Sequence, residues 1–412
     1  MTAAAGLTIP FPAVHLGPRG QTPLRHLVLL MRENRSFDHY FGTYRGAEGL
    51  PIGAPVTRAT ADCLPDPAHD EAALQALAGG ATAVSPDART VYTESRIPLA
   101  WALARRFTLC DHYFASVLAP TFPNRLFSVA ASAGDYRDNP ARFEPARLPR
   151  PNILDRLDAA RLDWGCYLAS VPDTHGYNAV AFYPERAADP RANRTFADFV
   201  SDSARGRLPA VSWVVPEDPL SEHPPTPPQW GQRFAALAVS AVQAGPQWPH
   251  TAVVLNYDES GGFYDHVRPP PVGGHSLGFR VPCVVASPFA KPGHVSHDVH
   301  DHASVLALIE STFGLSALND RDGAASPLAD CFDFDHPNPA PVEYPTSSPL
   351  PNCQELPRWA ADLLMQPLPS ASTDDHRGLE LAAALGGVAA GLAGGAAAAW
   401  RLRRDRSAMS GP

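Results

Sequence analysis

The sequence Thr251-Ala-Val-Val-Leu-Asn-Tyr-Asp-Glu-Ser-Gly-Gly-Phe-Tyr-Asp-His266 joins an apolar run to a cluster of acidic residues. The run consists largely of β-branched and aliphatic residues without polar alternation, which predicts a strand buried on both faces of a parallel sheet. Two adjacent carboxylates, Asp258 and Glu259, follow it directly, and two glycines come after them. Ligands of open α/β sheets bind at the carboxyl ends of strands, so we expect the chemistry at this end.

A second apolar run, residues 26–31, ends in the same way. Glu33 and Asn34 follow it, as Asp258 and Glu259 follow the first. Two strand ends that each deliver a pair of oxygen ligands to one sheet edge predict a site for a hard divalent ion. The alternative interpretation is a polar turn between a strand and a helix, with Ser36 as the helix cap.

The segment Ala119-Pro-Thr-Phe-Pro-Asn-Arg125 opens a third region of interest. Pro123 fits the first turn of a helix, which places Thr121 at or near the N-cap. A hydroxyl there lies beside free backbone N–H groups at the positive end of the helix dipole, where anions bind. Threonine is also a common N-cap, so Thr121 is either a nucleophile or only a cap.

The remaining chain alternates helical and strand patterns, which predicts an α/β fold with a mostly parallel central sheet and helices on both faces. His69 lies in a loop, and a lone loop histidine is most often solvated. His223 follows another strand end, and His302 opens a helix in which we expect a structural role. The predicted elements are a helix over 99–106, a helix and strand within 151–169, strands over 209–216 and 280–287, and helices over 233–244 and 301–313, the last capped by Asp301.

Composition excludes several classes of protein. A chain of 412 residues that is 45% hydrophobic can bury a large core, and 45 prolines argue against an all-helical fold. The net charge of -9 is spread without a basic block, so no nucleic-acid partner is expected.

The six cysteines show no C-x-x-C spacing, which disfavours a zinc knuckle or a redox pair. Cys110 and Cys283 lie in apolar runs and are predicted to be buried thiols. Cys331 and Cys353 lie in loops and are predicted to form a bridge if the protein is exported.

The two ends of the chain differ. Residues 1–12 lack the pattern of a signal peptide. Residues 381–400 are uncharged and followed by arginines, which predicts a membrane anchor with the body facing outward; the alternative is a flexible Ala/Gly tail. The predicted organisation is a lead-in over 1–22, a catalytic domain over 23–345, a Pro/Ser-rich linker over 346–377 and the anchor over 378–404.

Together, several segments resemble the bacterial phosphoesterase family of non-haemolytic-type phospholipases C and acid phosphatases, within the alkaline-phosphatase-like superfamily. The resemblance covers about residues 25–335 and implies an alkaline-phosphatase-like fold. Ser260 stands where many relatives have a histidine. The matching segments are Glu33-Asn-Arg-Ser-Phe-Asp-His39, residues 110–125, Val211-Ser-Trp with Ser221-Glu-His-Pro-Pro225, Tyr257-Asp-Glu-Ser-Gly-Gly-Phe-Tyr-Asp-His-Val267, and a final stretch over 280–310.

The resemblance also implies roles for individual residues around one divalent metal ion, which would be calcium, magnesium or a transition metal. The implied metal ligands are Glu33, Asn34, Thr121, Asp258 and Glu259. The implied catalytic residues are Thr121 as nucleophile with His69 and His223, and the implied substrate-binding residues are Asn124, His175 and His266.

The resemblance predicts a phospholipase C-type hydrolase of the cell envelope or the extracellular space, acting on a phospholipid or a small phosphoester through a phospho-threonine intermediate. A metal ion and a helix N-terminus both favour the alkoxide of a threonine, and histidine suits proton delivery near neutral pH. The alternatives are a broad-specificity acid phosphatase that uses the same residues and a non-catalytic anchored surface protein.

Overall fold

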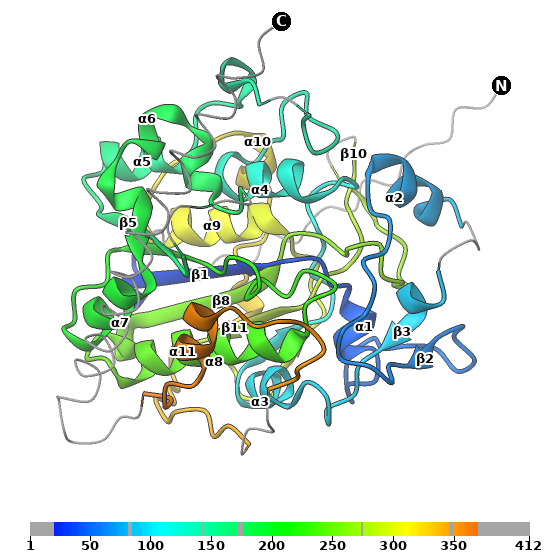
Figure 1. The fold of residues 1–412 in the computed structure, drawn as a ribbon. Helices are drawn as coiled ribbons and strands as arrows, with labels where there is room; N and C mark the ends of the chain where they lie inside the picture. Colours follow the sequence, from blue (N-terminus) through cyan, green and yellow to red (C-terminus); the bar gives the residue numbers. More distant parts are fainter. Residues whose placement is uncertain are drawn as a thin grey trace, which may run out of the picture.

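The structure, a computed structural model, describes residues 20–80, 85–141, 143–170, 173, 176–272, 275–345 and 350–369 (Figure 1). Its strands are β1 (His26–Arg32), β2 (Thr57–Arg58), β3 (Thr90–Val91), β4 (Thr108–Cys110), β5 (Trp164–Leu168), β6 (Arg194–Thr195), β7 (Val211–Val215), β8 (Thr251–Tyr257), β9 (Pro271–Val272), β10 (His275–Ser276), β11 (Cys283–Ala286) and β12 (Val295–Ser296). Its helices are α1 (Phe37–Phe41), α2 (Glu71–Ala78), α3 (Pro98–Arg106), α4 (Thr121–Ala130), α5 (Ile153–Ala159), α6 (Pro184–Ala187), α7 (Phe196–Ala204), α8 (Pro228–Ala244), α9 (His302–Phe313), α10 (Asp320–Gly323) and α11 (Arg358–Leu364). Short 3-10 helices are η1 (Asp87–Arg89), η2 (Pro145–Arg147), η3 (Ala179–Phe182), η4 (Pro190–Asn193), η5 (Trp248–His250) and η6 (Ala329–Cys331).

An eight-stranded sheet forms the centre, in the order β12-β4-β11-β8-β1-β7-β5-β6. The strands from β8 to β6 pair in parallel, whereas β11 runs antiparallel to both β8 and β4. Every residue of β5, β7, β8 and β11 is buried, as expected for strands covered on both faces. This confirms the predicted α/β class with a mostly parallel sheet.

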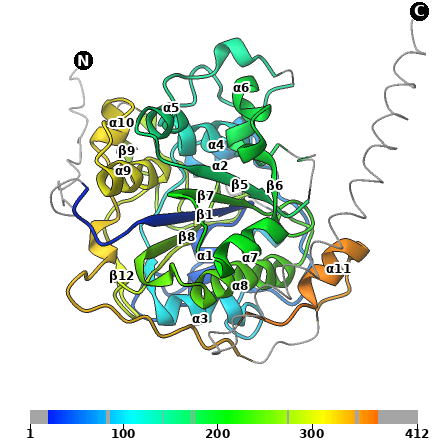
Figure 2. The same cartoon turned by 90° about the vertical axis from the view of Figure 1, so that its left-hand side faces the viewer.

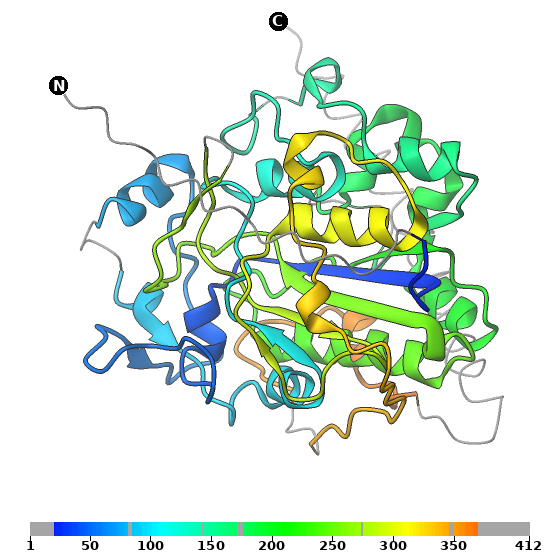
Figure 3. The ribbon, with the colours of Figure 1, turned by 180° about the vertical axis from the view of Figure 1, so that it is seen from behind.

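Helices cover both faces of this sheet. On one face α4 packs against α9, with α5 and α10 beside them, and on the other α8 packs against α3, α7 and α11 (Figures 1 and 2). Seen from behind, α9 lies beside β1 (Figure 3). Its cap is the predicted one, because the Asp301 side chain accepts a hydrogen bond from the N–H of Ser304.

The predicted helices are present with shifted boundaries. The helix predicted over 99–106 begins one residue earlier, at Pro98, and the helix predicted over 233–244 begins at Pro228. Proline fits the first turn of a helix because its missing N–H has no partner there in any case. The apolar run after Thr121 continues to Ala133, but α4 ends at Ala130, where Ala131 adopts a left-handed backbone with φ 51°.

The predicted bridge between Cys331 and Cys353 is wrong. Cys353 forms a disulfide with Cys63, whereas Cys331 is a free thiol buried against Cys110. Both cysteines of the predicted pair follow Pro- and Asp-rich sequence, but η6 points Cys331 into the core. Cys110 and Cys283 are buried free thiols, as predicted.

The C-terminal segment, defined here as residues 337–345 and 350–369, wraps around the helical face that carries α8. The indole of Trp248 donates to the carbonyl of Pro339, and that of Trp230 donates to the carbonyl of Pro351. Helix α11 packs on α8. None of the helices in the described ranges has the length and apolar content needed to cross a membrane, and the predicted anchor over 381–400 lies outside these ranges.

Candidate active site

The pairing of β1 with β8 brings the two predicted acidic pairs together. Arg32 lies opposite Tyr257 in the register of these neighbouring parallel strands, so Glu33 and Asp258 leave the sheet at the same level. The backbone N–H of Asn34 donates to Asp258 Oδ1 at 3.3 Å. The sequence prediction that these strand ends meet is therefore correct in its geometry.

Glycine at position 261 permits a close approach of the two strand ends. A Cβ atom on Gly261 would lie 2.6 Å from the Asn34 carbonyl oxygen, and its φ of +62° disfavours any other residue. The N–H of Gly261 donates to Glu259 Oε2 at 2.7 Å, and the N–H of Glu259 donates to Asp258 Oδ1 at 2.8 Å. Backbone donors thus orient both carboxylates.

Thr121 reaches this acidic cluster from the other side. Its hydroxyl donates to Glu33 Oε2 at 3.2 Å. Thr121 is the first residue of α4, next to the N-cap residue Pro120, so the predicted placement at or near the cap is confirmed. The expectation of free N–H groups beside it needs one correction: the N–H of Phe122 donates to Asn139 Oδ1 at 2.8 Å, because the following loop folds back over the helix start.

Arg125, one helical turn beyond Thr121, is the main counter-charge of the cluster. Its guanidinium donates to Glu33 Oε1 through Nε at 2.9 Å and also through Nη2. The Nε atom lies 3.6 Å from Asp258 Oδ2. Arg125 lies in the segment 110–125 that resembles the family, but the sequence analysis assigned it no role.

Three buried oxygens of this cluster have no hydrogen-bond partner within the described ranges. They are Asn34 Oδ1, Asp258 Oδ2 and Glu259 Oε1, on residues that are at most 1% exposed. Buried polar atoms are nearly always satisfied, and carboxylate and amide oxygens are the ligands that hard divalent ions take. The residues present therefore fit the metal ion that the family resemblance implies.

The electrostatics of the site also favour a cation. Burial raises the pKa of Glu33 well above its usual range; Arg125 opposes this shift and Asp258 adds to it. Burial likewise raises the pKa of Glu259 to about 8, with His69 opposing the shift and Asp258 adding to it. Since Glu33, Asp258 and Glu259 face one buried arginine, a bound cation would stabilise their charged forms.

Two of the predicted histidines lie beside this cluster. The ring of His69 has its Nε2 3.1 Å from Asn34 Nδ2 and 3.9 Å from Glu259 Oε1. The centroids of the His69 and His223 rings are 5.9 Å apart, and Asp66 completes a group whose ligand atoms all lie within 4.8 Å of one another. Burial lowers the pKa of His69, but Glu259, the Pro67 carbonyl and Asp66 outweigh it and raise the pKa overall.

The other predicted substrate-binding residues have different surroundings. His266 lies against Asp38, with its Nδ1 2.7 Å from Asp38 Oδ2, in a network that includes Arg280 and Asp265. The amide of Asn124 donates to the carbonyls of residues 117, 119 and 120 and accepts from the N–H of residue 117, so it holds the loop before Thr121. His175 lies outside the described ranges. Binding roles for all three stay predictions.

Glu222 is a supporting residue that the sequence analysis did not single out. Its buried carboxylate accepts hydrogen bonds from Arg32 at 2.7 Å and from the hydroxyls of Tyr40 and Tyr257, both at 2.6 Å. It directly precedes His223 and thereby fixes the chain that carries this histidine. A glutamate between a serine and a histidine in a proline-rich loop gives no local signal of burial.

His302 is a second supporting residue. It is buried, and its Nε2 lies 2.8 Å from the carbonyl oxygen of Asp258, while Nδ1 lies 3.2 Å from the hydroxyl of Tyr113. This is the structural role that we expected for it, although it acts directly behind the acidic cluster.

The α/β fold with an acidic cluster at the ends of its parallel strands is consistent with an enzyme, and comparisons with known proteins identify its class. Residues 24–316 match the model of the Phosphoesterase family, so the chain belongs to this family and is a phosphoric ester hydrolase. Phospholipase C B of Mycobacterium tuberculosis is 33% identical over 434 residues, covering 81% of this chain and 83% of the relative. Non-specific phospholipase C6 of Arabidopsis thaliana is 27% identical over 438 residues, covering 89% and 82%.

The chain also matches a longer relative and a solved structure. Non-hemolytic phospholipase C of Pseudomonas aeruginosa is 29% identical over 414 residues, which cover 79% of this chain and 59% of the relative. A solved structure of a protein in the alkaline phosphatase superfamily from Vibrio parahaemolyticus is 11% identical, with a TM-score of 0.43 and coverage of 77% of this chain and 74% of that one.

Proposed function

We propose that the protein is a metal-dependent phospholipase C-type phosphodiesterase that works through a phospho-threonine intermediate. It would cleave a phospholipid to diacylglycerol and a phosphorylated head group. The observation that carries this proposal is the Thr121 hydroxyl, 3.2 Å from Glu33 Oε2, beside three buried oxygens without partners in the described ranges. The phospholipase C names of the relatives support the substrate class.

In the first step of this proposal, Thr121 Oγ1 forms a bond to phosphorus while the bond from phosphorus to the glycerol oxygen breaks. Glu33 accepts the hydrogen of the Thr121 hydroxyl and is placed to take its proton. The pair of histidines, His69 and His223, would protonate the departing oxygen.

In the second step, water attacks phosphorus, the bond to Thr121 Oγ1 breaks, and the phosphorylated head group leaves. The same histidine pair would take a proton from the water, and Glu33 would return its proton to Thr121 Oγ1. Asn34, Asp258 and Glu259, with Glu33 and Thr121, would hold a divalent ion, which when bound supplies charge neutralisation for the phosphoryl oxygens and favours the Thr121 alkoxide. Arg125 keeps Glu33 in place throughout.

The test compares Thr121→Ala with Thr121→Ser. We expect Thr121→Ala to lose at least about 10³-fold in kcat/KM because the nucleophile is absent, while the free energy of unfolding changes by less than about 1 kcal/mol. Thr121→Ser keeps a hydroxyl and should retain measurable turnover. Acid-quenched wild-type protein should carry a phosphoryl group on the peptide that contains Thr121. Substantial activity in Thr121→Ala would sink the proposed mechanism.

The ester class is tested separately. Nitrophenyl phosphate and nitrophenyl phosphorylcholine present the same leaving group as a monoester and a diester. Faster turnover of the diester supports the phospholipase C-type activity, whereas a clear preference for the monoester favours the broad-specificity phosphatase. Elemental analysis of the active protein would identify the metal. A protein that contains no metal and hydrolyses neither ester would be non-catalytic.

We infer that the protein acts in the cell envelope or outside the cell. The Cys63–Cys353 disulfide supports this location, since structural disulfides form and persist mainly in oxidising compartments.

A further inference from the structure

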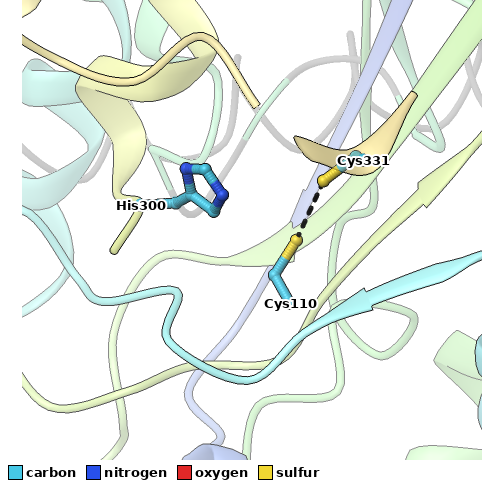
Figure 4. A group of neighbouring side chains, drawn as sticks. All are labelled: Cys110, His300 and Cys331. Carbon is cyan, nitrogen blue, oxygen red and sulfur yellow. Dashed lines mark hydrogen bonds between the residues drawn. The ribbon is translucent and has the colours of Figure 1, made fainter. Parts of the chain in front are cut away.

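A second group of ligand-type side chains lies in the core, on elements that do not carry the Thr121 site. Cys110 ends β4, Cys331 ends η6, and His300 directly precedes the cap residue of α9 (Figure 4). All three residues are 0% exposed. Figure 4 shows the two sulfur atoms facing each other, with an edge of the His300 ring turned toward them.

The geometry of this group is close to that of a bound metal ion. Cys110 Sγ and Cys331 Sγ are 3.5 Å apart, and one ligand atom from each of the three residues lies within 4.8 Å of the other two. Tetrahedral zinc with Zn–S of about 2.3 Å and Zn–N of about 2.0 Å places its ligand atoms roughly 3.5–3.8 Å apart. The sulfur pair already has this spacing, and a ring nitrogen of His300 lies within 4.8 Å of both sulfur atoms.

A third buried thiol, Cys283, lies next to this group on the neighbouring strand. It is the cross-strand partner of Cys110 in the antiparallel pairing of β11 with β4. Directly opposed residues of an antiparallel pair project to the same face of the sheet. Cys283 therefore lies beside the group, whose three ligand atoms come from Cys110, His300 and Cys331.

The hydrogen bonding of His300 does not explain why it is buried here. Its Nε2 lies 3.4 Å from Ser296 Oγ, at the long end for a hydrogen bond. Its Nδ1 makes no hydrogen bond of normal geometry within the described ranges, although the Ser326 carbonyl lies close enough to act on the ring. A buried imidazole without well-formed partners is costly in an apolar core, and a metal bond would offset this cost.

We propose that Cys110, His300 and Cys331 together bind a zinc ion in the core. Binding of Zn²⁺ converts the Cys110 and Cys331 thiols to thiolates and releases two protons to solvent, with no change in oxidation state. Two thiolates cancel the charge of the ion, so the complex adds no net charge to the core. The ion would tie the antiparallel end of the sheet to the start of α9.

Cobalt(II) is the probe for this site, because thiolate ligands give it an intense charge-transfer absorption that oxygen ligands do not. We expect this absorption when apo wild-type protein is titrated with Co²⁺, and its loss on addition of Zn²⁺. Cys331→Ser should lose the absorption. Cys166→Ser, which changes a buried free cysteine on β5, should keep it. Asp258→Asn in the acidic cluster should also keep it.

Thermal unfolding gives a second readout. Zn²⁺ should raise the Tm of the wild type and of Cys166→Ser, and should leave the Tm of Cys331→Ser unchanged. If the wild type shows no charge-transfer absorption with Co²⁺, the proposal is overturned, independently of the results for the variants. It is also overturned if the absorption survives in Cys331→Ser, or if thiol titration of unfolded wild type finds Cys110 and Cys331 joined in a disulfide.

Discussion

Arg125 shows how a single side chain can hold a site together. It is 2% exposed and donates to Glu33 through two nitrogen atoms, while its Nε also lies within 3.6 Å of Asp258 Oδ2. Removing one partner of a buried ion pair leaves an uncompensated charge, which costs far more than the pair contributes. Arg125 therefore positions the carboxylate that receives the Thr121 hydrogen bond.

For Arg125→Ala we expect a loss of about 3–5 kcal/mol in the free energy of unfolding, because Glu33 stays buried without its counter-charge. Arg125→Lys keeps the charge but not the two-nitrogen contact, and should lose less. Urea unfolding at neutral pH measures both. A loss below about 1 kcal/mol in Arg125→Ala would mean that the buried carboxylate does not depend on this arginine.

Some positions of individual site residues were predictable from the sequence, and others were not. Glu33 and Asp258 follow buried strands, and strand ends meet at a sheet edge, so their convergence followed from local pattern. The position of His69 beside Glu259 depended on a loop with no periodic pattern, and only the family resemblance suggested it. The contacts of Arg125 depend on the crossing of α4 over β1, which no local pattern encodes.

At the scale of elements, α1 is held to the loop after β8 by charge. Its Asp38 accepts from Arg280 at 2.9 Å and from His266, whose ring also faces Asp265 and lies near Glu48. The hydrogen bond to Asp38 is the largest influence on His266 and raises its pKa, while burial opposes this. The protonated ring thus connects two elements that flank the acidic cluster.

His266 should give the protein a pH-dependent stability. A histidine whose pKa is raised by folding stabilises the protein fully below its ordinary pKa of about 6.5, and this contribution is lost as pH rises through the folded pKa. The difference in unfolding free energy between wild type and His266→Gln should therefore be larger at about pH 5.5 than at about pH 8.5. Urea titrations at both pH values measure it, and an equal difference at the two would contradict the role given to Asp38.

The helices and strands also differ in how far their features could be predicted from the sequence. The cap of α9 was predictable because Asp301 precedes a long apolar helix pattern. The antiparallel direction of β11 was not, because a strand buried on both faces shows the same apolar run whichever way it pairs. Residues 346–377 were predicted to be a linker because of their proline and serine content, so the short apolar helix α11, which packs on α8, was missed.

For the whole molecule, the Cys63–Cys353 disulfide is the covalent cross-link found in the described ranges. It joins cysteines 290 residues apart, so nearly the whole catalytic domain lies inside the loop that it closes. Both cysteines lie in loops of the sequence, and the pairing depends on where the C-terminal segment crosses the folded domain. For this reason spacing alone could not identify the partners.

The double variant Cys63→Ser, Cys353→Ser should lose about 2–4 kcal/mol of unfolding free energy, since a covalent link over a long loop restricts the unfolded chain. Cys166→Ser is the matched control and should change stability by less. Guanidinium unfolding measures both, and limited proteolysis should cut the double variant first near residues 350–357. Equal stability of wild type and double variant would show that the link constrains little.

The same disulfide determines how a mechanical load would enter the protein. Tension applied to the chain beyond Cys353 is transmitted through the sulfur bridge to Cys63, six residues before His69. Tension between the two sides of the chain would bypass residues 64–352 and would be carried instead by the segment before Cys63, which includes the central strand β1. Because β1 delivers Glu33 and Asn34 to the acidic cluster, such a pull would reach the site through this strand and not through the loop that carries His69.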